Sequence, residues 1–315
     1  MANPALQRLL QKAGHPQLLH ALTDTLSLSE LNSLLMEVMK LKAARQTPAA
    51  LLHQYQQNRF VQPSAIPALA HAEAAQQVLA LADQQGFEAL TLSPLAPLGN
   101  CSVIARADQN KVVTALRGTE VVADATNLLA LEAAMRRQQQ PAATTPLHLC
   151  AIHRHVRAQA LPPGKGFTAH FQVFCAVTAG RDTGSSAFEA QALLAHLTYY
   201  ERLLKTLLPV PFCFTLKTFP TTPEEEAAVD KIKSYLQPHF RPERLAHEAV
   251  DPAAHRYYQL MRFSLDVQHK GHALNLGDGG FVDWSQQLTQ NRKERLFTSG
   301  LGLELLLKLK LGMIG

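Results

Sequence analysis

The chain has 315 residues, of which 47% are hydrophobic and only 17% charged, a composition that excludes an intrinsically disordered protein. The net charge of +5 suits ligands that carry phosphate, but it is too small to indicate a nucleic-acid partner by itself. No apolar run is long enough to cross a membrane and the N-terminus lacks a signal-peptide pattern, so we expect a cytoplasmic protein without a membrane anchor.

The N-terminal part of the chain is predicted to be a helical domain covering residues 1–65. Ser27 and Glu30 have the spacing of a capping box, and Thr47-Pro48 indicates the start of a further helix. The basic trio Lys40, Lys42 and Arg45 allows two interpretations, which are contact with an RNA backbone and stabilisation of a helix C-terminus. Residues 61–67, which contain two prolines, are the predicted linker.

The next segment is predicted to begin with a long Ala-rich helix from residue 68. Glycine at position 86 then leads into a strand over residues 86–95, which contains Pro94. A strand over residues 111–116 and a helix over 124–135 follow, with Asp124 or Thr126 as the N-cap residue of the helix.

A β-hairpin is predicted in the middle of the chain. Strand-like runs at residues 148–156 and 167–178 flank a break that contains two prolines and two glycines. Residues two apart on a strand share a face, so His153, His155 and Arg157 point the same way. Such a face would suit an anion or a nucleotide.

The C-terminal part alternates helices and strands. Helices are predicted over residues 185–208 and 222–235, with a strand over 212–219 between them. Three further strands are predicted over 257–267, 273–276 and 281–284, the last two separated by the run Gly277-Asp278-Gly279-Gly280. A Gly-rich strand then enters a helix at Gly300-Leu301-Gly302-Leu303-Glu304.

No metal site is predicted from the sequence. His148, Cys150, His153 and His155 fall on opposite faces of one strand and form no compact CxxC or HxxxH pair. Cys175 has no histidine at a spacing that would indicate a nucleophile and its base.

Several of these motifs resemble the class II aminoacyl-tRNA synthetases, with the layout of the histidyl type. Arg157-Ala158-Gln159, a loop and the run from His170 to Phe174 resemble motif 2. The helix, strand and proline of residues 70–95 resemble motif 1, and the run from Gly300 to Glu304 resembles motif 3. The resemblance implies an α+β fold with a mixed, mainly antiparallel sheet flanked by helices over residues 66–315. It also implies a homodimer formed through motif 1.

The resemblance further implies site residues and ligands. ATP and Mg²⁺ are the expected cofactors, and Arg157 would hold the α-phosphate as the catalytic residue. The other residues expected at the nucleotide are Gln159, Lys165, His170, Phe171, Gly300, Gly302 and Glu304. Those expected at an amino acid or other small carboxylate are Thr119, Glu120, Gln172, Tyr257, Tyr258, Gly279 and Gly280.

Four departures from the family pattern leave the function open. Leu305 stands where motif 3 has an arginine that grips the γ-phosphate, and Gln159 replaces a glutamate. The histidine-specific arginine is missing before Tyr257, and no anticodon-binding domain follows motif 3. The chain is therefore either an ATP-dependent enzyme that adenylates a carboxylate or a non-catalytic paralogue acting as a ligand-sensing or regulatory subunit. RNA binding through the N-terminal helices is a third possibility.

Overall fold

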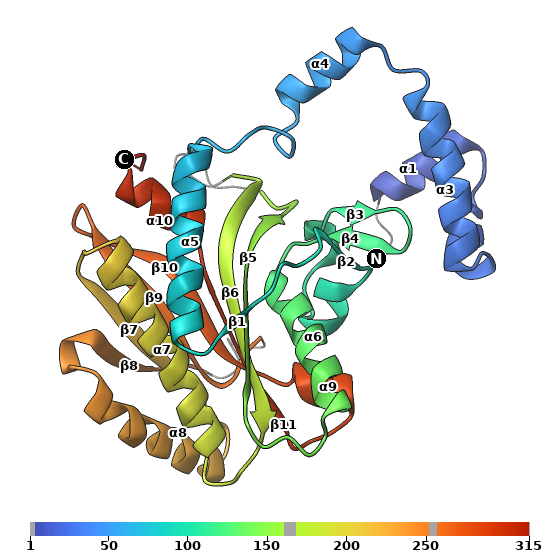
Figure 1. Ribbon diagram of the computed structural model, residues 1–315. Coiled ribbons are helices and arrows are strands. Elements are labelled where there is room, and N and C mark those ends of the chain that lie inside the picture. The colour runs from blue at the N-terminus through green and yellow to red at the C-terminus, as the bar shows by residue number, and fades with distance from the viewer. Residues whose placement is uncertain (1–3, 161–167, 252–256, 315) are drawn as a thin grey trace.

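The core of the protein is one large twisted sheet with helices on both faces (Figure 1). The computed structural model describes residues 4–160, 168–251 and 257–314. Within them, eight strands pair in the order β1-β5-β6-β11-β10-β9-β7-β8. These strands are β1 (Glu88–Ala89), β5 (Leu147–Val156), β6 (His170–Arg181), β7 (Phe212–Thr218), β8 (Leu245–Ala249), β9 (Gln259–His269), β10 (His272–Val282) and β11 (Glu294–Leu301).

The pairing within this sheet is antiparallel except at its two edges. β1 runs parallel to β5 and β8 runs parallel to β7, and the described strands between these pairs are antiparallel to their neighbours. The expected α+β fold with a mainly antiparallel sheet is thus confirmed. The predicted hairpin is formed by β5 and β6, with Ala151 opposite Cys175 and His155 opposite Phe171.

Each face of the sheet is covered by its own set of helices, because side chains alternate between the faces along a strand. On β6, the side chain of Phe174 belongs to the hydrophobic cluster on one face of the sheet, whereas Val173 and Cys175 belong to the hydrophobic cluster on the other face. The helices on the face of Phe174 are α5 (Ala68–Gln84), α7 (Ala187–Leu207), α8 (Pro223–Leu236) and α10 (Leu303–Lys310). The helices on the face of Val173 and Cys175 are α6 (Ala125–Gln139) and α9 (Trp284–Thr289).

A smaller sheet contains parts of two of the predicted strands. It has the order β2-β4-β3, with β2 (Leu95–Pro97), β3 (Thr114–Ala115) and β4 (Thr119–Val121). The strand predicted over 86–95 is split between the two sheets. The backbone amide of Leu90 donates a hydrogen bond to the carbonyl of Cys150 in the large sheet, whereas Leu95 pairs with Val121 in the small one. The start of the strand predicted over 111–116 is instead a 3₁₀ turn, which the Asp108 carboxylate closes by accepting from the Asn110 amide.

The glycines of residues 277–280 do not interrupt the sheet, contrary to the sequence-based prediction. They lie inside the continuous strand β10, which pairs with β9 on one side and β11 on the other. Trp284, expected to end a strand, begins α9. Ladder hydrogen bonds on both sides outweigh the conformational cost of glycine, and the neighbouring chains leave no space for a side chain. A Cβ atom on Gly279 would lie 2.6 Å from the Phe263 ring.

The N-terminal helices form an arm that extends away from the core (Figure 1). They are α1 (Pro4–Ala13), α2 (Leu18–His20), the π-helical turn at Ala21–Thr25, α3 (Leu28–Ala43) and α4 (Pro48–Gln57). The predicted capping box of Ser27 and Glu30 and the Thr47 cap are both present. None of these helices contains a buried residue. Asn32 accepts a hydrogen bond from the backbone of Arg117 in the core.

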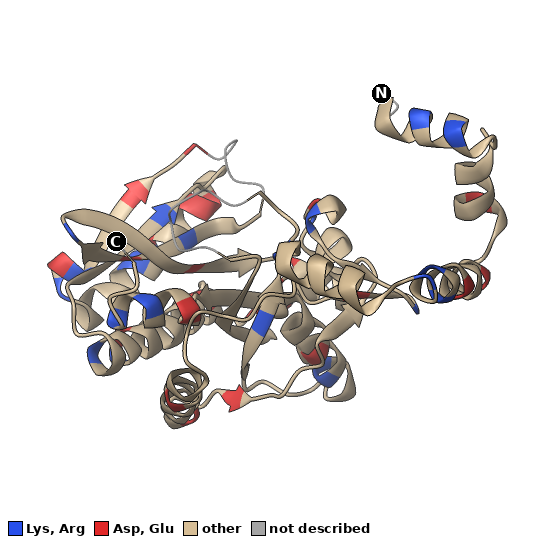
Figure 2. Cartoon of the chain, turned by 90° about the horizontal axis from the view of Figure 1, so that it is seen from above, with Lys and Arg blue, Asp and Glu red and all other residues tan. Residues whose placement is uncertain are grey.

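Charges on the arm and the core are interspersed rather than gathered on one basic face (Figure 2). Lys40, a member of the trio considered for RNA contact, lies 3.2 Å from Glu37 on the same helix. Lys40 and Lys42 both fall in the last turn of α3, where cations complement the helix dipole. Among the described helices, none combines the length and the apolar character needed to span a bilayer.

Deleting residues 1–57 is expected to change the free energy of unfolding of the core by less than about 1 kcal/mol, because the arm buries none of its described residues. The deletion keeps Gln62 and Ser64, whose polar atoms contact the core. Urea unfolding of the full chain and the shortened chain would measure the difference. A loss of several kcal/mol would show that the arm is an integral part of the core.

A chain of hydrogen bonds runs beneath α7, buried between this helix and the sheet. His196 contacts Ser299 Oγ at 2.7 Å and Thr178 Oγ1 at 2.8 Å, and Thr178 in turn contacts His148 Nδ1 at 2.8 Å. Tyr200 completes the chain at Ser299. Burial lowers the pKa of His196 well below its ordinary value and also lowers the pKa of His148.

This buried histidine pair predicts acid-sensitive stability. Above the unfolded-state pKa of about 6.5, neither state binds the extra proton and the full stability is present. As the pH falls below that value, the unfolded chain binds protons that the native protein does not, so stability falls by up to about 1.4 kcal/mol per pH unit for each histidine. Urea titrations between pH 7.5 and 5 would show the slope. An identical slope in His196→Gln would contradict the assignment.

Candidate functional site

Nine of the residues predicted to bind ligand line one cavity of about 440 Å³, namely Arg157, Gln159, Phe171, Gln172, Tyr257, Tyr258, Gly300, Gly302 and Glu304. Its walls come from β5, β6, β10 and β11, from the residues just after β5 and just before β9, from the start of α6 and from α10. The hairpin and the Gly-rich entry into α10 are far apart in sequence, and β11 pairs with β6 to bring them together.

The motif 2 arginine lies at the edge of this cavity. Arg157 follows the end of β5, and its Nε donates to the carbonyl of Ala123 at 2.9 Å. Its guanidinium carbon lies 5.3 Å from the ring centre of Phe171, and its Nη2 lies 3.7 Å from the Asp124 carboxylate. About a third of the side chain is exposed, so the cation can still meet a ligand. Gln159 also lines the cavity, as predicted, whereas Lys165 lies outside the described residues.

His170 does not line the cavity. Alternation along β6 places His170 on the opposite face from Phe171, where its Nδ1 lies 3.0 Å from Arg154. Its Nε2 contacts the carbonyl of Gln62 in the linker. His170, which was expected at the nucleotide, therefore lies outside the cavity. Gln172 lines the cavity, as expected.

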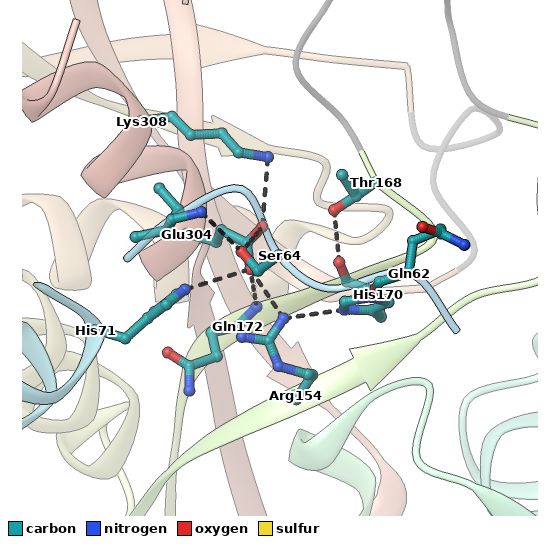
Figure 3. A network of polar contacts seen from close by, with 10 residues as sticks. Gln62, Ser64, His71, Arg154, Thr168, His170, Gln172, Glu304 and Lys308 are labelled. Atoms are coloured by element: carbon teal, nitrogen blue, oxygen red, sulfur yellow. Dashed lines mark hydrogen bonds and ion pairs between the residues drawn. The ribbon is translucent and has the colours of Figure 1, made fainter. Parts of the chain in front are cut away.

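Glu304 lies at the centre of a polar network that joins three parts of the chain (Figure 3). The residue is 1% exposed, and its carboxylate lies 3.0 Å from Arg154, 3.4 Å from Lys308 and 3.8 Å from His71. Ser64 of the linker donates a further hydrogen bond. Burial by itself would raise the pKa of Glu304, but Lys308, Ser64 and Arg154 together hold it below its ordinary value. The carboxylate therefore stabilises the junction of linker, hairpin and α10.

The Gly-rich entry into α10 faces the cavity as predicted. Gly300 and Gly302 both line it, and so does Leu305, the residue at the position of the motif 3 arginine. Leu305 also packs against the core. In this cavity, an apolar side chain therefore lies at the position where motif 3 has its phosphate-binding arginine.

Thr119 and Glu120 do not reach the cavity. They lie in β4 of the small sheet, where Glu120 is fully buried. The Glu120 carboxylate accepts hydrogen bonds from the backbone of Gly99 and Cys101 and from the Gln109 side chain. All of these partners lie in the segment between β2 and β3. Glu120 therefore orders that segment and does not face the cavity in which an amino-acid ligand was expected.

The tyrosine pair is in place, with an aspartate that the sequence interpretation did not single out. Tyr257 and Tyr258 both line the cavity, and Tyr258 donates a hydrogen bond to Asp278 at 3.0 Å. Burial raises the pKa of Asp278, although the Tyr258 hydroxyl and Arg262 oppose the shift. Gly280 leaves space for the Tyr258 ring, since a Cβ there would lie 2.6 Å from the ring. Gly279 and Gly280, both expected at the small carboxylate, do not line the cavity.

Cys175 has a histidine partner that its spacing in the sequence did not reveal. The thiol lies 3.7 Å from His155 Nε2, because β5 and β6 place both side chains on the same face. Asp124, which caps α6 by accepting from Thr126, lies beside them. Burial raises the pKa of the Cys175 thiol and lowers the pKa of His155 to about 3, so both are neutral at pH 7. All three residues line the cavity.

The antiparallel sheet, its motif 2 hairpin and the Gly-rich entry into α10 define a class II aminoacyl-tRNA synthetase-like fold. Solved structures of this class confirm it. An ATP phosphoribosyltransferase regulatory subunit/histidyl-tRNA synthetase from Bacillus halodurans aligns with a TM-score of 0.62 and 13% identity, covering 79% of this chain and 81% of that one.

Two further structures show the same fold. Apo histidyl-tRNA synthetase from S. aureus aligns with a TM-score of 0.59 and 13% identity over 80% of this chain and 68% of that one. The RNA binding domain of threonyl-tRNA synthetase from Cryptosporidium parvum aligns with a TM-score of 0.61 and 13% identity over 82% and 71% of the two chains. No protein-family model and no curated protein matches the sequence. At these identities the comparisons show the fold alone.

Proposed function

We propose that the cavity binds ATP together with a small carboxylic acid, with amino acids as the first candidates, and that the protein forms an adenylate from them. The observation that carries this proposal is the position of Arg157, whose guanidinium lies at the cavity edge beside Phe171. An aromatic ring next to a partly exposed arginine suits a base and its adjacent phosphate.

The proposed reaction requires little from the protein beyond positioning and charge stabilisation. A carboxylate oxygen attacks the α-phosphorus, the bond from that phosphorus to the bridging oxygen breaks, and pyrophosphate leaves. Arg157 stabilises the charge that develops on the α-phosphate, and Gln159 and Phe171 hold the adenine. Mg²⁺ bound with ATP would neutralise the leaving pyrophosphate.

We further propose a homodimer through α5 and the segment 86–95.

A second function is favoured by Leu305. An isobutyl group in the cavity cannot supply the charge-assisted hydrogen bonds that a γ-phosphate needs, and Glu304 holds the neighbouring Lys308 at 3.4 Å. A protein that binds a nucleotide or a carboxylate without turnover, as a regulatory subunit, would tolerate this change. ATP–pyrophosphate exchange with a panel of amino acids separates the two functions, because only the enzyme incorporates labelled pyrophosphate into ATP.

Arg157→Ala is expected to weaken ATP binding roughly ten- to hundredfold, the effect of losing a charge-assisted contact of about 1.5–3 kcal/mol. The matched control is Arg106→Ala, which removes an exposed arginine that does not line the cavity. Calorimetric titration with ATP measures both variants. Equal affinity in Arg157→Ala and the wild type would rule out a nucleotide at this arginine, whichever of the two functions holds.

A further inference from the structure

We propose that Asp124, His155 and Cys175 form a binding site for a divalent metal ion in the wall of the cavity, with zinc the best-suited ion. The three residues come from the start of α6, from β5 and from β6. One donor atom from each lies within 4.8 Å of the other two. His155 and Cys175 are each 1% exposed, so their positions are fixed by packing.

The distance between sulfur and nitrogen matches a tetrahedral zinc site. Zinc binds a thiolate at about 2.3 Å and an imidazole nitrogen at about 2.0–2.1 Å, which places the two donors about 3.6 Å apart at a tetrahedral angle. Cys175 Sγ lies 3.7 Å from His155 Nε2. Only a small adjustment of the two side chains is therefore needed to bring both onto one ion.

The hydrogen bonding of His155 is incomplete, which is unusual for a buried imidazole. The backbone amide of Ala125 donates to Nε2 at 3.0 Å, whereas Nδ1 has no partner among the described residues. The Ala125 and Thr126 amides also face the Cys175 sulfur. When an ion takes the Nε2 lone pair, the Ala125 amide can turn its hydrogen bond to the metal-bound thiolate. The backbone at the start of α6 thus serves the site with or without the ion.

The donor set explains the choice of zinc. A thiolate, an imidazole and a carboxylate are the ligands that zinc prefers, and the two anions balance its charge. Binding releases the thiol proton to solvent. All three residues line the cavity, so the fourth coordination position is open to it. Three protein ligands with an open position are typical of zinc that contacts a substrate or a water molecule. The ion would therefore bind an amine, hydroxyl or thiol group of the ligand.

This inference does not depend on ATP, since it uses side chains that the proposed adenylation leaves unassigned. The test measures metal alone, without nucleotide. The purified full chain is loaded with Zn²⁺, passed through a desalting column and assayed for metal, and one zinc per chain is expected. Loading with Co²⁺ instead should give the absorption of a thiolate bonded to cobalt, which reports Cys175 directly.

Three variants make the test specific. Cys175→Ser should abolish the thiolate-to-cobalt absorption, and Asp124→Asn should weaken zinc binding by more than roughly tenfold. Asparagine caps a helix as well as aspartate does, so Asp124→Asn removes a ligand and keeps the start of α6. The control is Cys150→Ser, which removes a buried thiol on the opposite face of β5 and should leave both signals unchanged.

The proposal is overturned if the wild type retains no zinc, or if Cys175→Ser gives the same cobalt spectrum as the wild type. The second result would place the ion on other histidines. If Cys175→Ser does not fold, Asp124→Asn decides, and an unchanged zinc affinity in that variant rejects the site.

Discussion

Glu304→Gln is expected to lower the free energy of unfolding by about 3 kcal/mol, because it removes the buried negative charge that faces the cations of Lys308 and Arg154. Lys308 is 6% exposed and lies 3.4 Å from the carboxylate, and Arg154 lies 3.0 Å from it and is about one-third exposed. Glutamine keeps the shape of the side chain and can still accept the bond from Ser64. The loss therefore reports charge rather than packing.

Urea unfolding of the variant and the wild type measures this effect. The unfolding free energy should depend on urea concentration with the same slope in both proteins. The matched control is Glu37→Gln, which breaks an ion pair with Lys40 on the exposed arm and should cost less than about 0.5 kcal/mol. A similar small loss in Glu304→Gln would mean that water reaches the network. Because the network joins the linker to the hairpin and α10, we also expect the variant to loosen the cavity wall.

Gly279→Ala is expected to destabilise the protein by about 3 kcal/mol or more, since a methyl group has no space inside the sheet. A Cβ on Gly279 would lie 2.5 Å from the carbonyl oxygen of Thr298 and 2.6 Å from the Phe263 ring. The first of these atoms belongs to the backbone of the neighbouring strand and cannot move without breaking the pairing of β10 with β11.

Gly300→Ala is the control for this prediction. A Cβ there would lie 3.5 Å from Val173, an ordinary contact, although Gly300 lies in the strand next to β10 and lines the cavity. Thermal unfolding of the two variants compares a crowded glycine with an uncrowded one. If Gly279→Ala were as stable as Gly300→Ala, the strands would be separated more widely than the structure shows, and the explanation for the glycines of β10 would be wrong.

The part of the site that could be predicted from the sequence lies on short, regular stretches. Arg157, Gln159 and Phe171 line the cavity, and the resemblance to motif 2 implied all three of them. Alternation along β6 places His170 on the other face from Phe171, but this rule alone does not exclude a residue from the cavity, since Gln172 shares the face of His170 and lines the cavity. Glu120 could not be excluded in this way either, because its hydrogen-bond partners are the amides of a loop whose path the sequence does not specify.

The sequence by itself determined the order of most helices and strands, the caps of several helices and the faces of the hairpin strands. These depend on residues within a few positions of one another, as for Ser27 with Glu30 and Thr222 with Glu225. Only the tertiary structure decided that the glycines of β10 continue a strand and that His155, Cys175 and Asp124 meet. Pairing with distant strands controls both outcomes, since a ladder on each side stabilises a glycine strand, and strand register brings together side chains that the chain separates.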